Sequence, residues 1–149
     1  MSNPARPDVF LGGSCNPTTW RTEVAIPLLE AAAMTYYNPQ VDDWTPELVD
    51  IERQAKAQAL NCLFIIDGQT RAVGSMVEVA AMLADDPSAI YLVIEDVPAG
   101  TEIDGQPVGD RERKDLNQGR AYLRDLASKY DVIVHESVTA AVRALIADW

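Results

Sequence analysis

The chain has 149 residues and a formal net charge of −11, from 12 lysines and arginines against 23 aspartates and glutamates. The length suits a single domain over residues 1–149, and the negative charge repels DNA and RNA, which argues against a nucleic-acid polymer as partner. No apolar run approaches the roughly 18 residues of a membrane span and no apolar core follows the first residues, so we expect neither a membrane span nor a signal peptide.

The chain begins with a strand followed by a helix. Residues 1–7 are of low complexity, and we expect them to be flexible, whereas residues 8–11 form an apolar strand. A helix begins at Thr18 or Thr19. Pro27 lies inside its apolar pattern, which predicts either a kink or a short first turn followed by a new start.

Strands and helices alternate along the rest of the chain. The near-continuous apolar runs at 62–67 and 89–96 are typical of strands covered on both faces, and Asp104-Gly105 predicts a two-residue hairpin. Thr45-Pro46, a capping residue followed by proline, is a good helix start. The pattern predicts strands over residues 34–39, 62–67, 89–96 and 131–135, and helices over 45–60, from 75, over 111–129 and from 137.

Five strands alternating with five helices predict a flavodoxin-like α/β fold. We expect a five-stranded parallel sheet in the order 2-1-3-4-5, between two layers of helices. Ligands of such sheets bind beyond the carboxyl ends of the strands, where the order reverses between strands 1 and 3. The predicted pocket is therefore lined by residues 12–19, 38–44 and 67–78.

Glu78 allows two interpretations. Ser75 and Glu78 fit a capping box, in which the glutamate turns back to the serine amide at the start of a helix. Glu78 would also lie at the mouth of the predicted pocket, in the first helical turn, which favours its ionised form. An ionised carboxylate there is a suitable nucleophile for a sugar carbon.

Two further carboxylates are candidates for the same pocket. Glu52 lies on or beside the buried stripe of its helix, one helix–strand–loop unit before Glu78; alternatively it is a surface residue of an acidic protein. Asp67 ends a strand just before Gly68, where it either faces the ligand or forms the turn.

The loops after the first two strands supply candidate binding residues. Gly12, Gly13 and Ser14 resemble a phosphate cradle without a Walker A ending, although two glycines are also common in a tight turn. After the second strand, Trp44 is suited to stack on a base and Gln40 to bond its edge; a buried tryptophan plug is the alternative. Basic side chains such as Arg21 and Arg71 are more often solvated than functional, and we assign His135 no role.

The two cysteines, Cys15 and Cys62, form no spaced framework, which suits a reducing, cytoplasmic setting. Two scattered cysteines and one histidine argue strongly against a zinc site.

Several segments together resemble the nucleoside 2-deoxyribosyltransferase-like family, over essentially the whole chain. These segments are VFLGGSCNPTTWR, YYNPQVDDW, SMVEVA and NQGRAYLRDLA. The resemblance implies a flavodoxin-like sheet, homodimers or larger oligomers, and cleavage of the N-glycosidic bond of small nucleosides or their 5′-monophosphates. It implies no metal and no organic cofactor.

The resemblance also implies residue roles. The nucleophile falls on Glu78, an upstream carboxylate that holds the sugar falls on or next to Glu52, and an asparagine donated by a neighbouring subunit corresponds to Asn117. The chain departs from the transferases at Phe10, where they carry tyrosine, and at Ala72, where they carry aspartate. These departures favour hydrolysis, another glycosyl substrate or a lost activity over base exchange.

The sequence therefore predicts an N-glycosidase or deoxyribosyltransferase-like enzyme that uses Glu78. Two alternatives remain open. One is a glycohydrolase of NAD-type dinucleotides, since TIR-like domains also use a glutamate near a helix start; the other is a non-catalytic nucleotide-binding module.

Overall fold

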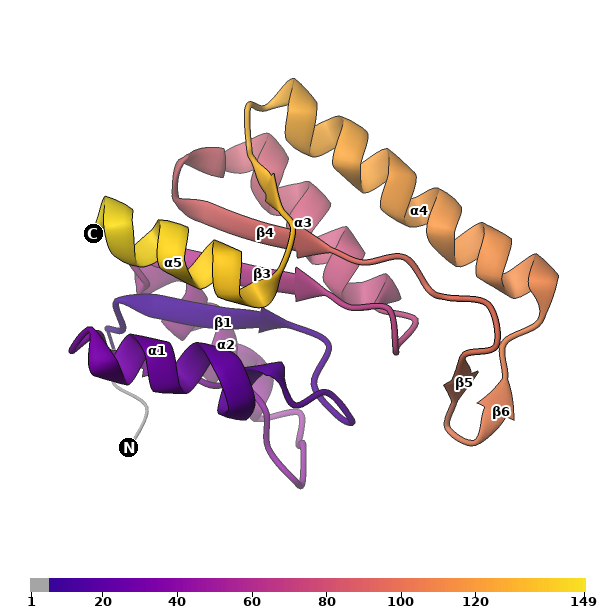
Figure 1. Ribbon diagram of the computed structural model, residues 1–149. Coiled ribbons are helices and arrows are strands. Elements are labelled where there is room, and N and C mark those ends of the chain that lie inside the picture. Colours follow the sequence, from indigo (N-terminus) through magenta and orange to yellow (C-terminus); the bar gives the residue numbers. More distant parts are fainter. Residues whose placement is uncertain (1–5) are drawn as a thin grey trace.

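A computed structural model describes residues 6–149 and shows one parallel sheet between two layers of helices (Figure 1). The sheet order is β2-β1-β3-β4-β7, which confirms the flavodoxin-like order expected from the sequence. Of the segment expected to be flexible, residues 1–5 lie outside the described residues. The strands are β1 Val9–Gly13, β2 Tyr36–Tyr37, β3 Asn61–Ile66, β4 Ile90–Ile94 and β7 Val134–His135.

The helices divide between the two faces of the sheet. In Figure 1 the indigo α1 and the yellow α5 lie together in front of the strands, and α3 lies behind them. Two separate apolar clusters fill these two layers, one under α1 and α5 and the other under α2, α3 and α4. The helices are the π-helical turn η1 Arg21–Ala25, α1 Ile26–Ala31, α2 Leu48–Gln58, α3 Val73–Asp85, the 3-10 turn η2 Pro87–Ala89, α4 Asp110–Lys129 and α5 Val138–Asp148.

The position of β3 at the centre of the sheet explains why its sequence does not alternate between apolar and polar residues. Leu63 and Ile65 pack in the cluster under α1 and α5, whereas Phe64 and Ile66 pack in the cluster under α2, α3 and α4. Both faces of β3 are therefore buried, and an apolar side chain is favoured at every position.

A two-residue hairpin protrudes between β4 and α4, as Asp104-Gly105 predicted. Its strands β5 Glu102–Ile103 and β6 Gln106–Pro107 pair antiparallel, and Asp104 and Gly105 both have positive φ, at 52° and 74°. Ile103 is buried with Val97, Val108 and Leu116, so the hairpin is fastened to α4. Among the described residues, no helix is long and apolar enough to cross a membrane.

Two helix starts differ from the prediction. The first helical segment begins after Trp20 without a side-chain cap, so the predicted threonine cap was wrong. The backbone stays helical where η1 passes into α1 at Ala25 and Ile26, with Pro27 in the first turn of α1, so the predicted new start was wrong too. Thr45-Pro46 forms a turn ahead of α2, in which the Thr45 carbonyl accepts from the Leu48 amide at 3.0 Å. The helix itself begins at Leu48.

Candidate active site

Glu78 does not form the predicted capping box. Helix α3 begins at Val73, because Ala72 takes up the left-handed conformation at the N-cap, with φ 56°, and its carbonyl accepts from the Met76 amide at 2.9 Å. Ser75 is therefore inside the helix and Glu78 lies in the second turn. The prediction of a first-turn glutamate next to the helix N-terminus was wrong, and the helix dipole contributes little at this depth.

The Glu78 carboxylate instead reaches across to the neighbouring helix. Its Oε1 accepts a hydrogen bond from Nζ of Lys56 on α2, and the two side chains form an ion pair. The Glu78 side chain is 39% exposed and that of Lys56 24% exposed. A small ligand can therefore reach the Glu78 carboxylate, and the ammonium of Lys56 lies next to it.

Glu52 lies one turn before Lys56 on the same helix and is partly buried. Burial raises the pKa of Glu52, and the negative charge of Glu78 raises it further, while Lys56 and Arg21 oppose the shift. Two carboxylates from different helices thus lie within electrostatic reach of each other. A carboxyl group with a raised pKa beside an ion-paired carboxylate is the arrangement that acid–nucleophile chemistry requires.

Two side chains that the sequence analysis did not select complete this cluster. Cys15, after β1, is partly buried; burial raises the pKa of its thiol, Arg21 lowers it, and Glu52 and Glu78 raise it. Tyr37, on β2, has a phenol whose pKa is raised by burial and then by Glu52. The side chains of Cys15 and Tyr37 therefore both lie within electrostatic reach of Glu52.

Tyr37 also supplies a phenol beside Phe10. The parallel register pairs Phe10 with Tyr37, and their rings stack with centroids 5.6 Å apart and an interplanar angle of 5°. Phe10 lacks a hydroxyl, but the adjacent strand brings one to the same face of the sheet. The pairing of the two strands was the signal that could have identified Tyr37.

Arg21 is not solvated, contrary to the interpretation from sequence. It is fully buried, and its guanidinium donates to the carbonyls of Leu11, Gly13 and Ser14 at 3.1, 2.9 and 3.0 Å. Burial lowers the pKa of Arg21 to about 10, against the pull of Cys15, Asp67 and Glu52. Arg21 therefore shapes the loop after β1, and these hydrogen bonds leave its guanidinium committed to that loop.

The two glycines of this loop are required by close packing. A Cβ on Gly12 would lie 2.4 Å from the ring of Phe64, and a Cβ on Gly13 would lie 2.2 Å from the carbonyl oxygen of Ile65. Gly13 also has a φ of 117°. These contacts support the tight-turn interpretation over a phosphate cradle, although Ser14 lines a cavity of about 240 Å³ together with Arg71.

The two predicted base-binding residues, Gln40 and Trp44, differ in their contacts. The amide nitrogen of Gln40 is used in hydrogen bonds within the chain, because Nε2 donates to Oδ1 of Asn16 at 3.0 Å and to the Thr18 carbonyl at 2.9 Å. It thereby joins the loops after β1 and β2. Trp44 is 57% exposed, so the alternative of a buried plug was wrong.

Asp67 forms the turn after β3. It is buried, and its carboxylate accepts from the Gln69 amide at 2.8 Å and from the Thr70 hydroxyl at 2.6 Å. Asp67 also lines a cavity of about 210 Å³ at the carboxyl edge of the sheet. Asp67 follows β3 next to the switch point, but both of its carboxylate oxygens accept hydrogen bonds within the turn.

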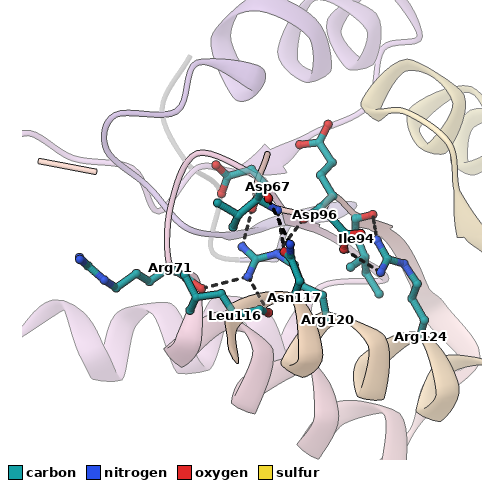
Figure 2. Close-up of polar contacts among 10 residues, drawn as sticks. Asp67, Arg71, Ile94, Asp96, Leu116, Asn117, Arg120 and Arg124 are labelled. Atoms are coloured by element: carbon teal, nitrogen blue, oxygen red, sulfur yellow. Dashed lines mark hydrogen bonds and ion pairs between the residues drawn. The ribbon is translucent and has the colours of Figure 1, made fainter. Parts of the chain in front are cut away.

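Arg120, on α4, holds this turn in place (Figure 2). The guanidinium is fully buried and donates to the carbonyls of Asp67 at 2.7 Å, Thr70 at 2.9 Å and Glu95 at 2.7 Å. Burial lowers the pKa of Arg120, and Asp67 is the first of the acidic groups that oppose this shift. No sequence signal marked Arg120, because its partners are backbone carbonyls.

Asn117 is also committed within its own chain. Its Oδ1 accepts from the Val97 amide at 2.7 Å and its Nδ2 donates to the Val97 carbonyl at 3.1 Å. Figure 2 shows the side chains of Asn117 and Arg120 on the same side of α4. These two hydrogen bonds fix the side chain of Asn117 against Val97, and its role in a neighbouring subunit's site stays a prediction.

The sheet order defines a class: a flavodoxin-like α/β protein. Within it, the helices that follow β2 and β3 carry two carboxylates, Glu52 and Glu78, that lie within electrostatic reach of each other. The comparisons with known proteins make this more specific.

The chain belongs to the nucleoside 2-deoxyribosyltransferase-like family, whose model matches residues 6–97. The match covers β1 to the end of β4, including Glu52 and Glu78, but it leaves out α4, so Asn117 lies outside it and the expected whole-chain match is too long. Searches of curated proteins and of solved structures return no match to the chain. The family supports glycosyl transfer on nucleosides and the binding of a small nucleoside.

Proposed function

We propose that this protein cleaves or transfers at the N-glycosidic bond of a small nucleoside or nucleoside 5′-monophosphate, with Glu78 as nucleophile and Glu52 as the second carboxylate. The observation that carries the proposal is that these two carboxylates lie within electrostatic reach of each other, on the helices that follow β2 and β3 and within the matched family segment. The partial exposure of Glu78 leaves a sugar access to its carboxylate.

The chemistry follows from the different surroundings of the two groups. An oxygen of ionised Glu78 attacks C1 of the sugar, the C1–N bond breaks, and the base leaves with the bonding electron pair. Glu52 retains its proton to higher pH than a solvated glutamate does, because of burial and the nearby Glu78 charge, and it donates that proton to the leaving base. Water or a second base then attacks C1 and gives up a proton to Glu52, which regenerates the acid, while the bond between C1 and Glu78 breaks and releases the Glu78 carboxylate.

The direct test measures free base by chromatography, after incubation with a panel of nucleosides and their 5′-monophosphates. We expect Glu78→Gln to lower base release by at least about a thousandfold, since it removes the nucleophile. Asp85→Asn is the matched control, because Asp85 is an exposed acid on the same helix. Intact-protein mass spectrometry should detect a sugar ester on the unmodified protein only. Equal base release from Glu78→Gln would refute the assignment.

One observation favours a second candidate, a non-catalytic nucleotide-binding module. Lys56 already occupies one oxygen of Glu78, as a purely structural ion pair would. Tight nucleotide binding without base release, unchanged in Glu78→Gln, would support this candidate. Release of nicotinamide from a dinucleotide in the same panel would instead support an NAD-type glycohydrolase.

We further propose that the chain acts as one domain in a cytoplasmic homodimer or larger oligomer, as its resemblance to the family implies. Sedimentation of the purified protein at several concentrations tests the oligomeric state.

A further inference from the structure

The ion pair between Lys56 and Glu78 differs from the other ion pairs of the described residues. Its side chains are 24% and 39% exposed, whereas the pair of Arg53 and Asp50, one turn earlier on α2, is 67% and 76% exposed. The paired residues are 22 apart in sequence and link two helices. A sheltered ion pair between separate elements fixes a side chain more firmly than an exposed pair within one helix.

We infer that Lys56 is the positioning residue of the proposed reaction: its ammonium holds Oε1 of Glu78 and leaves Oε2 to meet the sugar. This inference rests on the proposed function. Lys56 does not touch the sugar in this proposal, because its ammonium acts through the carboxylate of Glu78.

The charges around Glu78 show why a cation is needed there. On α2 the facing groups are Lys56 and Glu52, and burial and Glu78 together raise the pKa of Glu52. From the strand side, the thiols of Cys15 and Cys62 feel the negative charge of Glu78, and burial raises the pKa of Cys62 to about 12. Both thiols are therefore neutral near pH 7. Lys56 is the group that offsets two adjacent carboxylates.

Two other groups of cations in residues 6–149, Arg21 and the basic side chains of α4, are not placed to hold the Glu78 carboxylate. The Arg21 guanidinium reaches Glu52 only through its field, since its three nitrogens donate to carbonyls of the loop after β1. Helix α4 approaches α3 at Met76, against Gly119. Met76 and Glu78 are two residues apart, hence about 200° apart around the helix, so the cations of α4 lie on the other side.

Lys56→Met tests the inference, since it removes the charge and keeps an apolar stem. We expect kcat/KM for base release to fall about tenfold at pH 7, with KM nearly unchanged. The loss should lie in kcat, because the ammonium holds the reacting carboxylate and does not touch the sugar. Lys56→Arg should restore most of the activity, because a guanidinium can hold the same oxygen.

Arg53→Met is the matched control, because it removes one positive charge from the same helix without touching Glu78. We expect its kcat and KM to match those of the unmodified protein. If Lys56→Met retains the kcat of the unmodified protein while Glu78→Gln abolishes base release, the inference is overturned and the proposed function stands.

A second measurement is independent of turnover. The side-chain carboxyl 13C resonance of Glu78, assigned with Glu78→Gln, is recorded at pH 7 in the unmodified protein, in Lys56→Met and in Arg53→Met. We expect the resonance to move in Lys56→Met only, because only that substitution removes the ammonium bound to the carboxylate. An unmoved resonance overturns the inference for an active or an inactive protein, whereas absent base release from the unmodified protein counts against the proposed function alone.

Discussion

Arg120→Met is the most informative perturbation of the loop that leads into α3. The substitution keeps a long apolar side chain on α4 but removes every donor of the guanidinium. The carbonyls of Asp67, Thr70 and Glu95 then lose donors at 2.7, 2.9 and 2.7 Å. Leu116, whose carbonyl also accepts from Arg120, lies inside the helix and keeps its backbone partner.

The expected cost follows from these three carbonyls. A buried polar group left without a partner costs about 1–3 kcal/mol, and water can reach the partly buried carbonyl of Glu95. The gain from no longer burying a cation offsets part of the loss. We therefore expect the free energy of unfolding to fall by about 3–5 kcal/mol, a large part of the about 5–15 kcal/mol that stabilises a domain.

Urea denaturation followed by circular dichroism measures this change. Arg111→Met is the control, because Arg111 lies on the same helix, its side chain is 93% exposed, and it pairs with Asp115 only at 3.9 Å. We expect the control to cost less than about 0.5 kcal/mol. A loss below about 1 kcal/mol for Arg120→Met, or equal losses for both variants, would refute the reasoning.

Two further predictions concern the loop after β1 and the acidic pair. Gly13→Ala should lower the melting temperature by more than about 5 °C, because the new Cβ would lie 2.2 Å from the Ile65 carbonyl oxygen and the φ of Gly13 is 117°. Gly74→Ala, in open space on α3, should raise the melting temperature slightly. Similar effects of the two substitutions would contradict the role given to Gly13. Glu52→Gln should stabilise the protein at pH 7 but not below about pH 4, because the raised pKa of Glu52 makes the folded state lose stability as this group ionises. Melting curves at the two pH values measure the difference, and equal curves at pH 7 would contradict the shift.

Local patterns were sufficient for most of the architecture. Apolar runs without alternation identified β3 and β4, and Asp104-Gly105 identified the hairpin, because burial on both faces and positive φ each restrict the residue types at one position. The alternation of strands and helices then led to the sheet order. Glu78 and Glu52 could be selected in the same way, from chain order and the place of the switch point.

The sequence by itself thus determined which elements form and in which order the strands lie, since apolar period and turn chemistry depend on neighbouring residues. The tertiary structure alone decided where α3 begins and what Glu78 contacts. Ser75 and Glu78 matched a capping box, yet Arg120, far along the chain, holds the preceding turn and α3 starts two residues earlier. A buried arginine that binds carbonyls leaves no sequence mark, because every residue carries a carbonyl. The partner of Glu78 also emerged only from the structure, because Lys56 and Glu78 are 22 residues apart in the chain and lie on different helices.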